Sequence, residues 1–318
     1  MIRLRSGIAR WLSAALMLLP ILLHAATVED LYETTQPVEG SQDAAFAKAL
    51  ETVLVRVSGQ RDAPARVGAA LANPRSYVQR YGITQENVLQ VGFDDVSIER
   101  LLIEAGLPIW GRERPTVLVV LNLEELGGAW LSGDAPPMDK DRIARAAHWR
   151  GLPLLWGSID SQDASLLSMG ASPALVQIAE RNGANAILVG RGRRDALHWI
   201  LASRDGVSDA SGTLEDGIHL AADTFARLFA AEGASLSQVN LEVSGITNLD
   251  AYASTLNYLE SLTLVRAVAV EQVAADTLRL RLAVRGDART LQRAIALDDR
   301  LIASGDSAGA TLAFRYQP

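Results

Sequence analysis

The sequence predicts a multi-domain α+β protein, in which small α/β modules precede a C-terminal antiparallel sheet with two helices. Three observations lead to this prediction. The aliphatic run TVLVVLNL at 116–123 is typical of a strand buried on both faces. Apolar stripes with the helical period recur along the chain. Near the C-terminus, apolar and polar residues alternate over 277–285, as they do in a strand with one buried face.

The N-terminal region, 27–112, is predicted to form one α+β domain. Its clearest element is a helix over about 42–57, whose apolar residues fall on one face and which Gly59 is placed to end. Because each element has a single apolar face, these elements need a partner layer. The others expected are short helical pieces at 66–72 and 75–81, a strand at NVLQVGF (87–93) and a helix at 96–105.

The middle region, 113–234, is predicted to form an α/β domain around the strand at 116–123. Glycines and capping residues divide the rest of it into alternating elements. Asp205-Gly206 is a hairpin signal between two of the later strands. The expected elements are a helix at 140–150, a strand at 152–157, a helix at 172–182, strands at 184–194 and 196–203, a third strand after Gly206 and a closing helix at about 218–229.

The C-terminal region, 235–318, is predicted to form a ferredoxin-like βαββαβ domain, with both helices on one side of a four-stranded antiparallel sheet. The strand at 277–285 alternates cleanly, so that its leucines face the helices and its arginines face outward. The expected elements are strands at 239–246, 263–273, 277–285 and 310–316 and helices at 249–261 and 288–303.

Residues 1–26 are predicted to be a secretion signal. Three arginines precede the apolar run Trp11–Leu23, and small residues follow at Ala25 and Ala26. A membrane anchor is the alternative, but a spanning helix needs about 20 apolar residues. This run has 13 and contains Pro20. We expect cleavage after Ala25 or Ala26 and a periplasmic location. Because no cysteine follows, a lipoprotein anchor is not expected.

The composition disfavours several classes of function. The chain has no cysteine, so disulfides and thiolate chemistry are excluded. It carries 30 Lys+Arg and 37 Asp+Glu, and removal of a signal with three arginines and no acid leaves 27 against 37, a net charge of −10. This negative charge disfavours binding to nucleic acid or to anionic lipid headgroups. No second stretch approaches membrane-spanning length, so we expect no integral membrane segment after signal cleavage.

No pattern predicts a catalytic residue, a metal site or a cofactor. GDSAG at 305–309 matches G-x-S-x-G, but no histidine or acid follows Ser307 to complete a triad, so a turn is expected. His148, His198 and His219 lack metal-ligand spacing, and structural roles are expected for them. Acidic pairs near helix starts favour capping and solvation. These pairs are Asp94-Asp95, Glu124-Glu125, Asp139 with Asp141, Glu215-Asp216 and Asp298-Asp299.

Three segments carry a resemblance to a known family: VEDLYETTQPVEGSQDAAFAKALETVLVRVSGQ (28–60), NPRSYVQRYGI (73–83) and ERPTVLVVLNLEE (113–125). They are similar to the exported proteobacterial proteins grouped as domain of unknown function 2066. The likeness covers most of the chain after the signal and is strongest over the first hundred or so residues. That family has no assigned activity, ligand or catalytic residue, so the resemblance implies export and no particular chemistry.

A row of arginines is the best candidate for a binding site. Arg279, Arg281 and Arg285 share the outward face of the strand at 277–285, and Arg315 on the last strand is expected beside them. They are either arginines of a solvated face paired with Glu242 or a docking face for an acidic partner. RNA binding is not expected, because this face carries no stacking aromatic residues.

The sequence therefore leads to the hypothesis of a non-enzymatic periplasmic protein that binds another, unidentified envelope protein as a scaffold or accessory. Two alternatives remain. An envelope hydrolase would bring two carboxylates within about 5–10 Å of each other in a deep pocket. A small-ligand carrier would contain an apolar cavity of about 300 Å³ or more.

Overall fold

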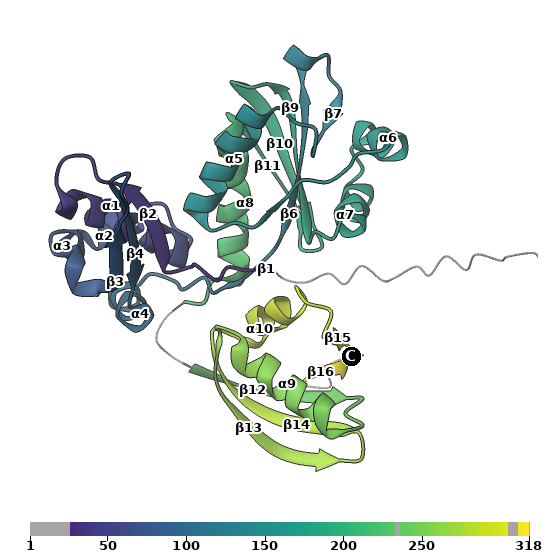
Figure 1. The fold of residues 1–318 in the computed structure, drawn as a ribbon. Helices are drawn as coiled ribbons and strands as arrows, with labels where there is room; N and C mark the ends of the chain where they lie inside the picture. The colour runs from purple at the N-terminus through teal and green to yellow at the C-terminus, as the bar shows by residue number, and fades with distance from the viewer. Residues whose placement is uncertain (1–25, 233–235, 305–310, 318) are drawn as a thin grey trace, which may run out of the picture.

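The computed structural model of the 318-residue chain describes residues 26–232, 236–304 and 311–317 (Figure 1). The predicted signal, apart from its last residue, and the G-x-S-x-G sequence at 305–309 lie outside these residues. The described chain is a mixed α+β structure with three main sheets, as the sequence predicts. We refer to the elements within 27–112, 113–234 and 235–318 as the N-terminal, middle and C-terminal units; these boundaries remain predictions.

The N-terminal unit is built on helix α1, Gln42–Ser58, which packs on the sheet β2-β4-β3. The Ser41 side chain accepts a hydrogen bond from the backbone N–H of Ala44, and Gly59 ends the helix at φ 70°, as predicted. The other elements are β2 (Glu33–Pro37), α2 (Ala63–Arg66), α3 (Gly68–Leu71), a 3₁₀ turn (Pro74–Tyr77), β3 (Val78–Ile83), β4 (Val88–Phe93) and α4 (Asp95–Glu104).

The helical piece predicted at 75–81 is wrong. Only a 3₁₀ turn forms there, and the chain continues as β3, antiparallel to β4. Tertiary contacts override the local pattern, because Tyr81 pairs with Val91 across the sheet and packs edge-on against Phe46 of α1, with ring centroids 5.2 Å apart. Strand β2 was not predicted, because ETTQP has no alternation of apolar residues; it pairs with β4.

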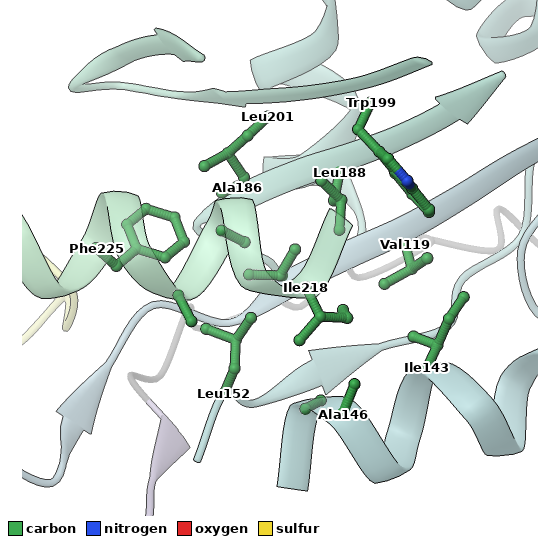
Figure 2. Packing of buried hydrophobic residues seen from close by; sticks show 14 of the residues in the cluster. Val119, Ile143, Ala146, Leu152, Ala186, Leu188, Trp199, Leu201, Ile218 and Phe225 are labelled. Carbon is green, nitrogen blue, oxygen red and sulfur yellow. The ribbon is translucent and has the colours of Figure 1, made fainter. Parts of the chain in front are cut away.

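The middle unit is built on β6 (Val117–Leu123), which is buried on both faces as predicted. Helices α5 and α8 cover one face of its sheet and α6 and α7 cover the other (Figure 1). Figure 2 shows Val119, Leu188 and Ile218 meeting in the larger of the two cores. The elements are β7 (Trp130–Leu131), α5 (Pro137–Arg150), β8 (Leu154–Leu155), α6 (Ser161–Met169), α7 (Ser172–Arg181), β9 (Ala186–Arg193), β10 (Ala196–Ser203), β11 (Gly206–Gly212) and α8 (Leu214–Phe229).

The strand order of this sheet is β11-β10-β9-β6-β7, and β8 also pairs with β6. Strands β8 and β9 both run parallel to β6, while the β9-β10-β11 meander is antiparallel. Gly151 ends α5 at φ 62°, as predicted. Thr213 and Asp216 form a capping box that starts α8. The short strand β7 and helix α6 were not predicted.

The C-terminal unit is a five-stranded sheet with the order β13-β14-β12-β16-β15, and α9 and α10 lie on one of its faces (Figure 1). Leu278, Leu280, Leu282 and Val284 are buried against these helices, as predicted. The elements are β12 (Leu236–Ser244), α9 (Leu249–Ser261), β13 (Val265–Ala274), β14 (Thr277–Arg285), α10 (Ala288–Ile295), β15 (Leu301–Ala303) and β16 (Thr311–Tyr316).

Two details of the predicted C-terminal sheet are wrong. The helix expected to continue to 303 ends at Ile295, and the chain then forms the short strand β15. Strand β16 is antiparallel to β15 but parallel to β12, so the sheet is neither four-stranded nor fully antiparallel. The physical reason is that β15 already takes the direction expected of the last strand, so β16, which is antiparallel to β15, lies parallel to β12.

Candidate functional site

Three buried arginines lie where the N-terminal and middle units meet. Arg56 comes from the last turn of α1, Arg114 from the short strand β5 (Glu113–Arg114) and Arg150 from the last residue of α5. Their exposed fractions are 1%, 0% and 0%. A buried cation is costly unless its N–H groups are bonded. We call these three residues, with His148, His219 and Asp223, the arginine junction.

Arg114 ties together the C-terminal ends of two helices. Its guanidinium donates to the backbone carbonyl of Arg56 at 2.7 Å and to those of Arg150 and Gly151 at 2.9 Å. It also donates to the carbonyls of Gly111 and Trp110 and lies 3.9 Å from the centroid of the Trp110 ring. Burial lowers the pKa of Arg114 well below its ordinary value. The negative dipole ends of α1 and α5 offset part of the cost of burying this charge.

Arg56 and Arg150 reach across the same boundary in opposite directions. Arg56 donates to His148 on α5, with an N–N distance of 3.3 Å, and to the carbonyls of Asp30 and Glu33 in its own unit. Arg150 donates to the carbonyl of Gly59 behind α1 at 2.8 Å. Each helix therefore supplies one arginine to the other unit.

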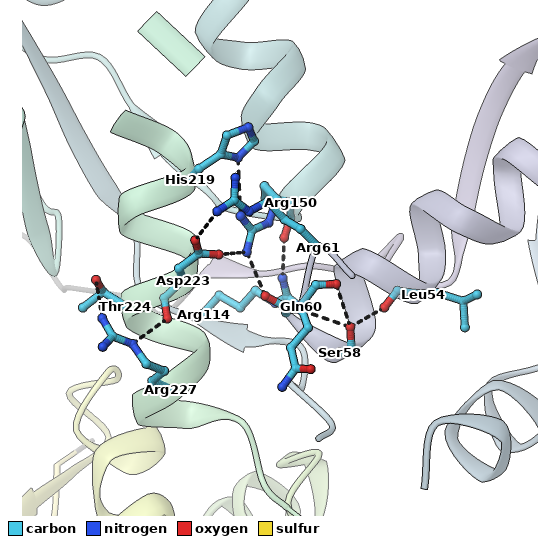
Figure 3. Close-up of polar contacts among 11 residues, drawn as sticks. Leu54, Ser58, Gln60, Arg61, Arg114, Arg150, His219, Asp223, Thr224 and Arg227 are labelled. Carbon is cyan, nitrogen blue, oxygen red and sulfur yellow. Dashed lines mark hydrogen bonds and ion pairs between the residues drawn. The ribbon is translucent and has the colours of Figure 1, made fainter. Parts of the chain in front are cut away.

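Asp223 on α8 supplies the negative charge of the junction. Its carboxylate accepts from Arg150 at 2.6 Å and from Arg61, in the loop after α1, at 3.1 Å (Figure 3). Among the described residues, no other carboxylate lies within ion-pair distance of Arg56, Arg114 or Arg150. The junction is therefore rich in positive charge, and its guanidinium groups donate mainly to carbonyl oxygens. Within the described residues, the buried Nε atoms of Arg56 and Arg150 have no acceptor.

His148 and His219 lie on the two sides of the junction. His219 Nδ1 is 3.4 Å from the Arg150 guanidinium (Figure 3). The His219 ring also meets the Trp149 ring edge-on. Burial, followed by the neighbouring arginines, lowers the pKa of both imidazoles. Structural roles were predicted for the histidines, and these two take part in the contact between the units.

Two cavities of about 500 and 520 Å³ flank the junction. Arg61, Asp223 and Arg227 line the first, and Arg56 and His148 line the second, beside Glu29 and Asp30. Charged side chains of both signs therefore line the cavities, together with apolar residues.

The structure does not bring the four predicted arginines together on one open face. Arg279 pairs with Glu242 at 2.8 Å, as one of the two interpretations expects, and Arg281 pairs with Glu271. For Arg315 on β16, no ion pair is found within the described parts of the chain. Residues of β12, β14 and β16 surround a shallow cavity of about 400 Å³ on this face, among them Asn240, Glu242, Arg279 and Thr311.

Arg285 lies apart from the rest of this row, because another unit covers it. Only 9% of its side chain is exposed, and it donates to Glu99 of α4 at 2.9 Å. Glu99 also accepts from Arg266 on β13. The alternation along β14 places Arg285 on the outward face, but no sequence pattern indicates that α4 packs against that end of the strand.

The acidic pairs cap helices or form ion pairs at several positions. Asp94 caps α4 by accepting from the backbone N–H of Ser97 at 2.8 Å. Asp139 forms a two-pronged ion pair with Arg194, and Glu215 forms one with Arg142. In the residues that the structure describes, no group of three or more histidine or acidic side chains is placed to hold a metal ion.

The arginine junction was not predicted from the sequence. A signal was present, because Arg56 interrupts the apolar run VLVRV and Arg114 directly precedes the proline before the most buried strand. A charge inside an apolar stretch indicates a buried polar role. The partners of Arg114 could not be predicted, because they include distant backbone carbonyls. The carbonyl of Arg150 is 36 residues away in the sequence, and that of Arg56 is 58 residues away.

Comparison with known families corrects the resemblance proposed above. The family model that matches the chain describes a domain of unknown function, number 8605, and covers residues 25–111. The assignment to domain of unknown function 2066 is therefore wrong, although both are domains without a known function. No curated protein and no solved structure matches the chain. Within the described residues, no helix is both long and apolar enough to cross a bilayer.

Proposed function

We propose that the protein is a non-enzymatic component of the bacterial cell envelope that binds another protein, through the open face of its C-terminal sheet. The observation that carries the proposal is the location of both helices, α9 and α10, on the opposite face. The open face presents the alternate residues of β12, β14 and β16 around a shallow cavity. A sheet face without a covering layer is available to a partner.

The charges on this face favour a partner with an acidic surface. The Arg279–Glu242 and Arg281–Glu271 pairs are exposed, with both arginine side chains more than half accessible. Exposed pairs of this kind contribute only about 0–1 kcal/mol, so acidic groups of a partner can replace their acceptors at little cost. Arg315 adds a further exposed cation on β16. Arg285 is not part of the proposed surface, because Glu99 already covers it.

Reversing the charge of Arg281 and Arg315 together is expected to weaken capture of the partner by about tenfold, because two attractive contacts become repulsive. The measurement is chemical crosslinking followed by pull-down from an envelope extract, with the captured protein identified and then titrated against the pure variants. The control is the Arg193→Glu/Arg204→Glu variant, which has the same net charge and changes exposed pairs of the middle unit. Equal capture by both double variants would contradict the proposed surface.

We also propose that residues 1–26 direct export to the periplasm and are then removed. The protein isolated from native cells is expected to begin at Ala26 or Thr27, because both cleavage positions leave an alanine before the cut. Mass spectrometry of the intact protein and of its N-terminal peptide measures this directly. A chain that retains Met1 and fractionates with the cytosol would exclude export.

We infer that the C-terminal unit is a variant of the ferredoxin-like arrangement. The order β12-α9-β13-β14-α10 supports this inference, as does the β13-β14-β12 neighbour sequence with both helices on one face. The variant feature is the hairpin β15-β16, which places a parallel strand beside β12.

A further inference from the structure

The two hydrogen bonds between imidazole and guanidinium groups in the arginine junction require neutral histidines. An arginine side chain has only donors, so the imidazole nitrogen that faces it must carry a lone pair. For His148 this nitrogen is Nε2, which faces Arg56. For His219 it is Nδ1, which faces Arg150. The geometry therefore assigns the tautomers: His148 carries its proton on Nδ1, and His219 carries its proton on Nε2.

The arginines beside each imidazole oppose its protonation, whereas the nearby carboxylates favour it. His148 faces Arg56 on α1 and, on the segment before β2, the carboxylate of Asp30. His219 faces two arginines: Arg150 on α5 and Arg61 in the loop after α1.

On its own helix, His219 also faces Asp216 and Asp223. These carboxylates are already engaged, Asp216 with the Thr213 cap and Asp223 with Arg61 and Arg150. The histidine is also packed against Trp149. Among the charged groups around each imidazole, an arginine has the largest effect on the pKa, which it lowers.

Both contacts bear on the boundary between the N-terminal and middle units. The Arg56–His148 bond crosses this boundary directly. The Arg150–His219 bond lies within the middle unit, but it orients the guanidinium whose other nitrogen reaches Gly59 behind α1. Protonation of either imidazole removes the acceptor and places a second positive charge beside the arginine, which repels it.

We propose that the arginine junction is a pH-sensitive joint, in which proton uptake by His148 and His219 loosens the contact of α1 with α5 and α8. Arg114 does not depend on either imidazole, because all its acceptors are backbone carbonyls. The Arg114 hydrogen bonds therefore keep the two units connected, while the surrounding contact of α1 with α5 and α8 becomes more mobile. This proposal is independent of the proposed binding surface on the C-terminal unit.

The sign of the pH effect follows from proton linkage. The pKa of both histidines is lowered from the ordinary value of 6.5, chiefly by burial. The closed junction therefore binds fewer protons than the opened one in the window just below that value. Its stability is fully present above about pH 6.5 and decreases as the pH falls.

Amide hydrogen exchange of the purified protein tests the joint. On going from about pH 7.5 to about pH 5.5, after correction for the intrinsic pH dependence of exchange, amides at the C-terminal ends of α1 and α5 are expected to exchange roughly threefold faster or more. Amides of α9 and β14 in the C-terminal unit, whose contacts include no histidine, provide the internal reference. A constant exchange rate at the two helix ends would overturn the proposal.

Neutral replacements of the two imidazoles make the test specific. In His148→Gln the amide oxygen lies near the position of Nε2, and in His219→Asn it lies near that of Nδ1, so the double variant keeps both acceptors at every pH. It is expected to lose the pH response. The control is His198→Gln, an exposed histidine of β10, which is expected to retain the response. A double variant that still responds like the wild type would also overturn the proposal.

A measurement on the wild-type protein removes any dependence on the folding of variants. Nitrogen NMR of uniformly labelled histidine distinguishes the two neutral tautomers of imidazole. At about pH 7.5 the expected spectrum has the His148 proton on Nδ1 and the His219 proton on Nε2, and both rings are expected to titrate below the ordinary imidazole pKa of 6.5. The opposite tautomers, or titration of either ring at or above pH 6.5, would contradict the assigned contacts.

Discussion

Replacing Arg114 with leucine is expected to lower the free energy of unfolding by about 3–5 kcal/mol, because it removes charged hydrogen bonds and leaves buried carbonyls without donors. The guanidinium of Arg114 has no solvent exposure and donates to five backbone carbonyls. A leucine side chain can form none of these hydrogen bonds, and the stacking of the guanidinium on the Trp110 ring is also lost. Denaturant unfolding monitored by circular dichroism measures the change.

Two further variants complete the test: one separates the hydrogen-bond donors of the guanidinium from its charge, and the other is an exposed control. Arg114→Lys keeps the charge but has three donors on a single nitrogen, so it is expected to recover less than half of the loss. Arg193→Leu removes an exposed arginine that pairs with the exposed Asp195, and it is expected to change the stability by less than about 0.5 kcal/mol. An Arg114→Leu change as small as that of Arg193→Leu would show that the junction contributes little to stability.

The second large effect is expected at Gly217, where α8 passes over Trp199. Glycine to alanine in the interior of a helix normally stabilises it by about 1 kcal/mol. Here an added Cβ would overlap the indole ring of Trp199, which is fully buried on β10. Figure 2 shows this ring in the core between the sheet and its helices. Gly217→Ala is therefore expected to lower the free energy of unfolding by about 1–3 kcal/mol.

A double-mutant cycle identifies the cause of this loss. Trp199→Leu alone is expected to be destabilising, because it leaves space in the core. In that background Gly217→Ala should cost little or become favourable, since the ring that it would overlap is gone. The matched control is Gly68→Ala in α3, where an added Cβ meets no heavy atom within 4 Å. If the cost of Gly217→Ala is the same with and without Trp199, the close approach is not its origin.

Elements with a strong local signal could be predicted from the sequence. Strand β6 was predicted because all its residues but Asn122 are aliphatic, and β14 because apolar residues alternate with arginines along it. Helices α1 and α5 could be bounded because Gly59 and Gly151 adopt positive φ at their ends. In each of these cases the signal lies within the element itself or in the residue that follows it.

Elements that depend on distant partners could not be predicted. The segment Val78–Ile83 is a strand because β4 and Phe46 are beside it, and β15 forms only by pairing with β16. The same limit applies to the sites. The arginines of β14 could be placed on one face by alternation, but the burial of Arg285 under Glu99 depends on the packing of α4, 186 residues away.

The junction was missed for a related reason. Its acceptors are backbone carbonyls, and every residue has one, so residue types carry no information about which of them Arg114 binds. Only the arginines are specific to the sequence, and a lone arginine in an apolar segment has many possible partners. The structure supplies the missing information by bringing the ends of α1 and α5 to the same guanidinium.

The contacts of the segment 109–114 also imply an order of assembly during synthesis. Arg114 bonds the carbonyl of Arg150, and Ile109 pairs with Ala231 in an isolated bridge. The first of these partners emerges from the ribosome 36 residues after Arg114, and the second 122 residues after Ile109. The segment 109–114 can therefore reach its final position only after α8 of the middle unit has been synthesised. Until then, Ala231, the partner of Ile109, is absent from the nascent chain.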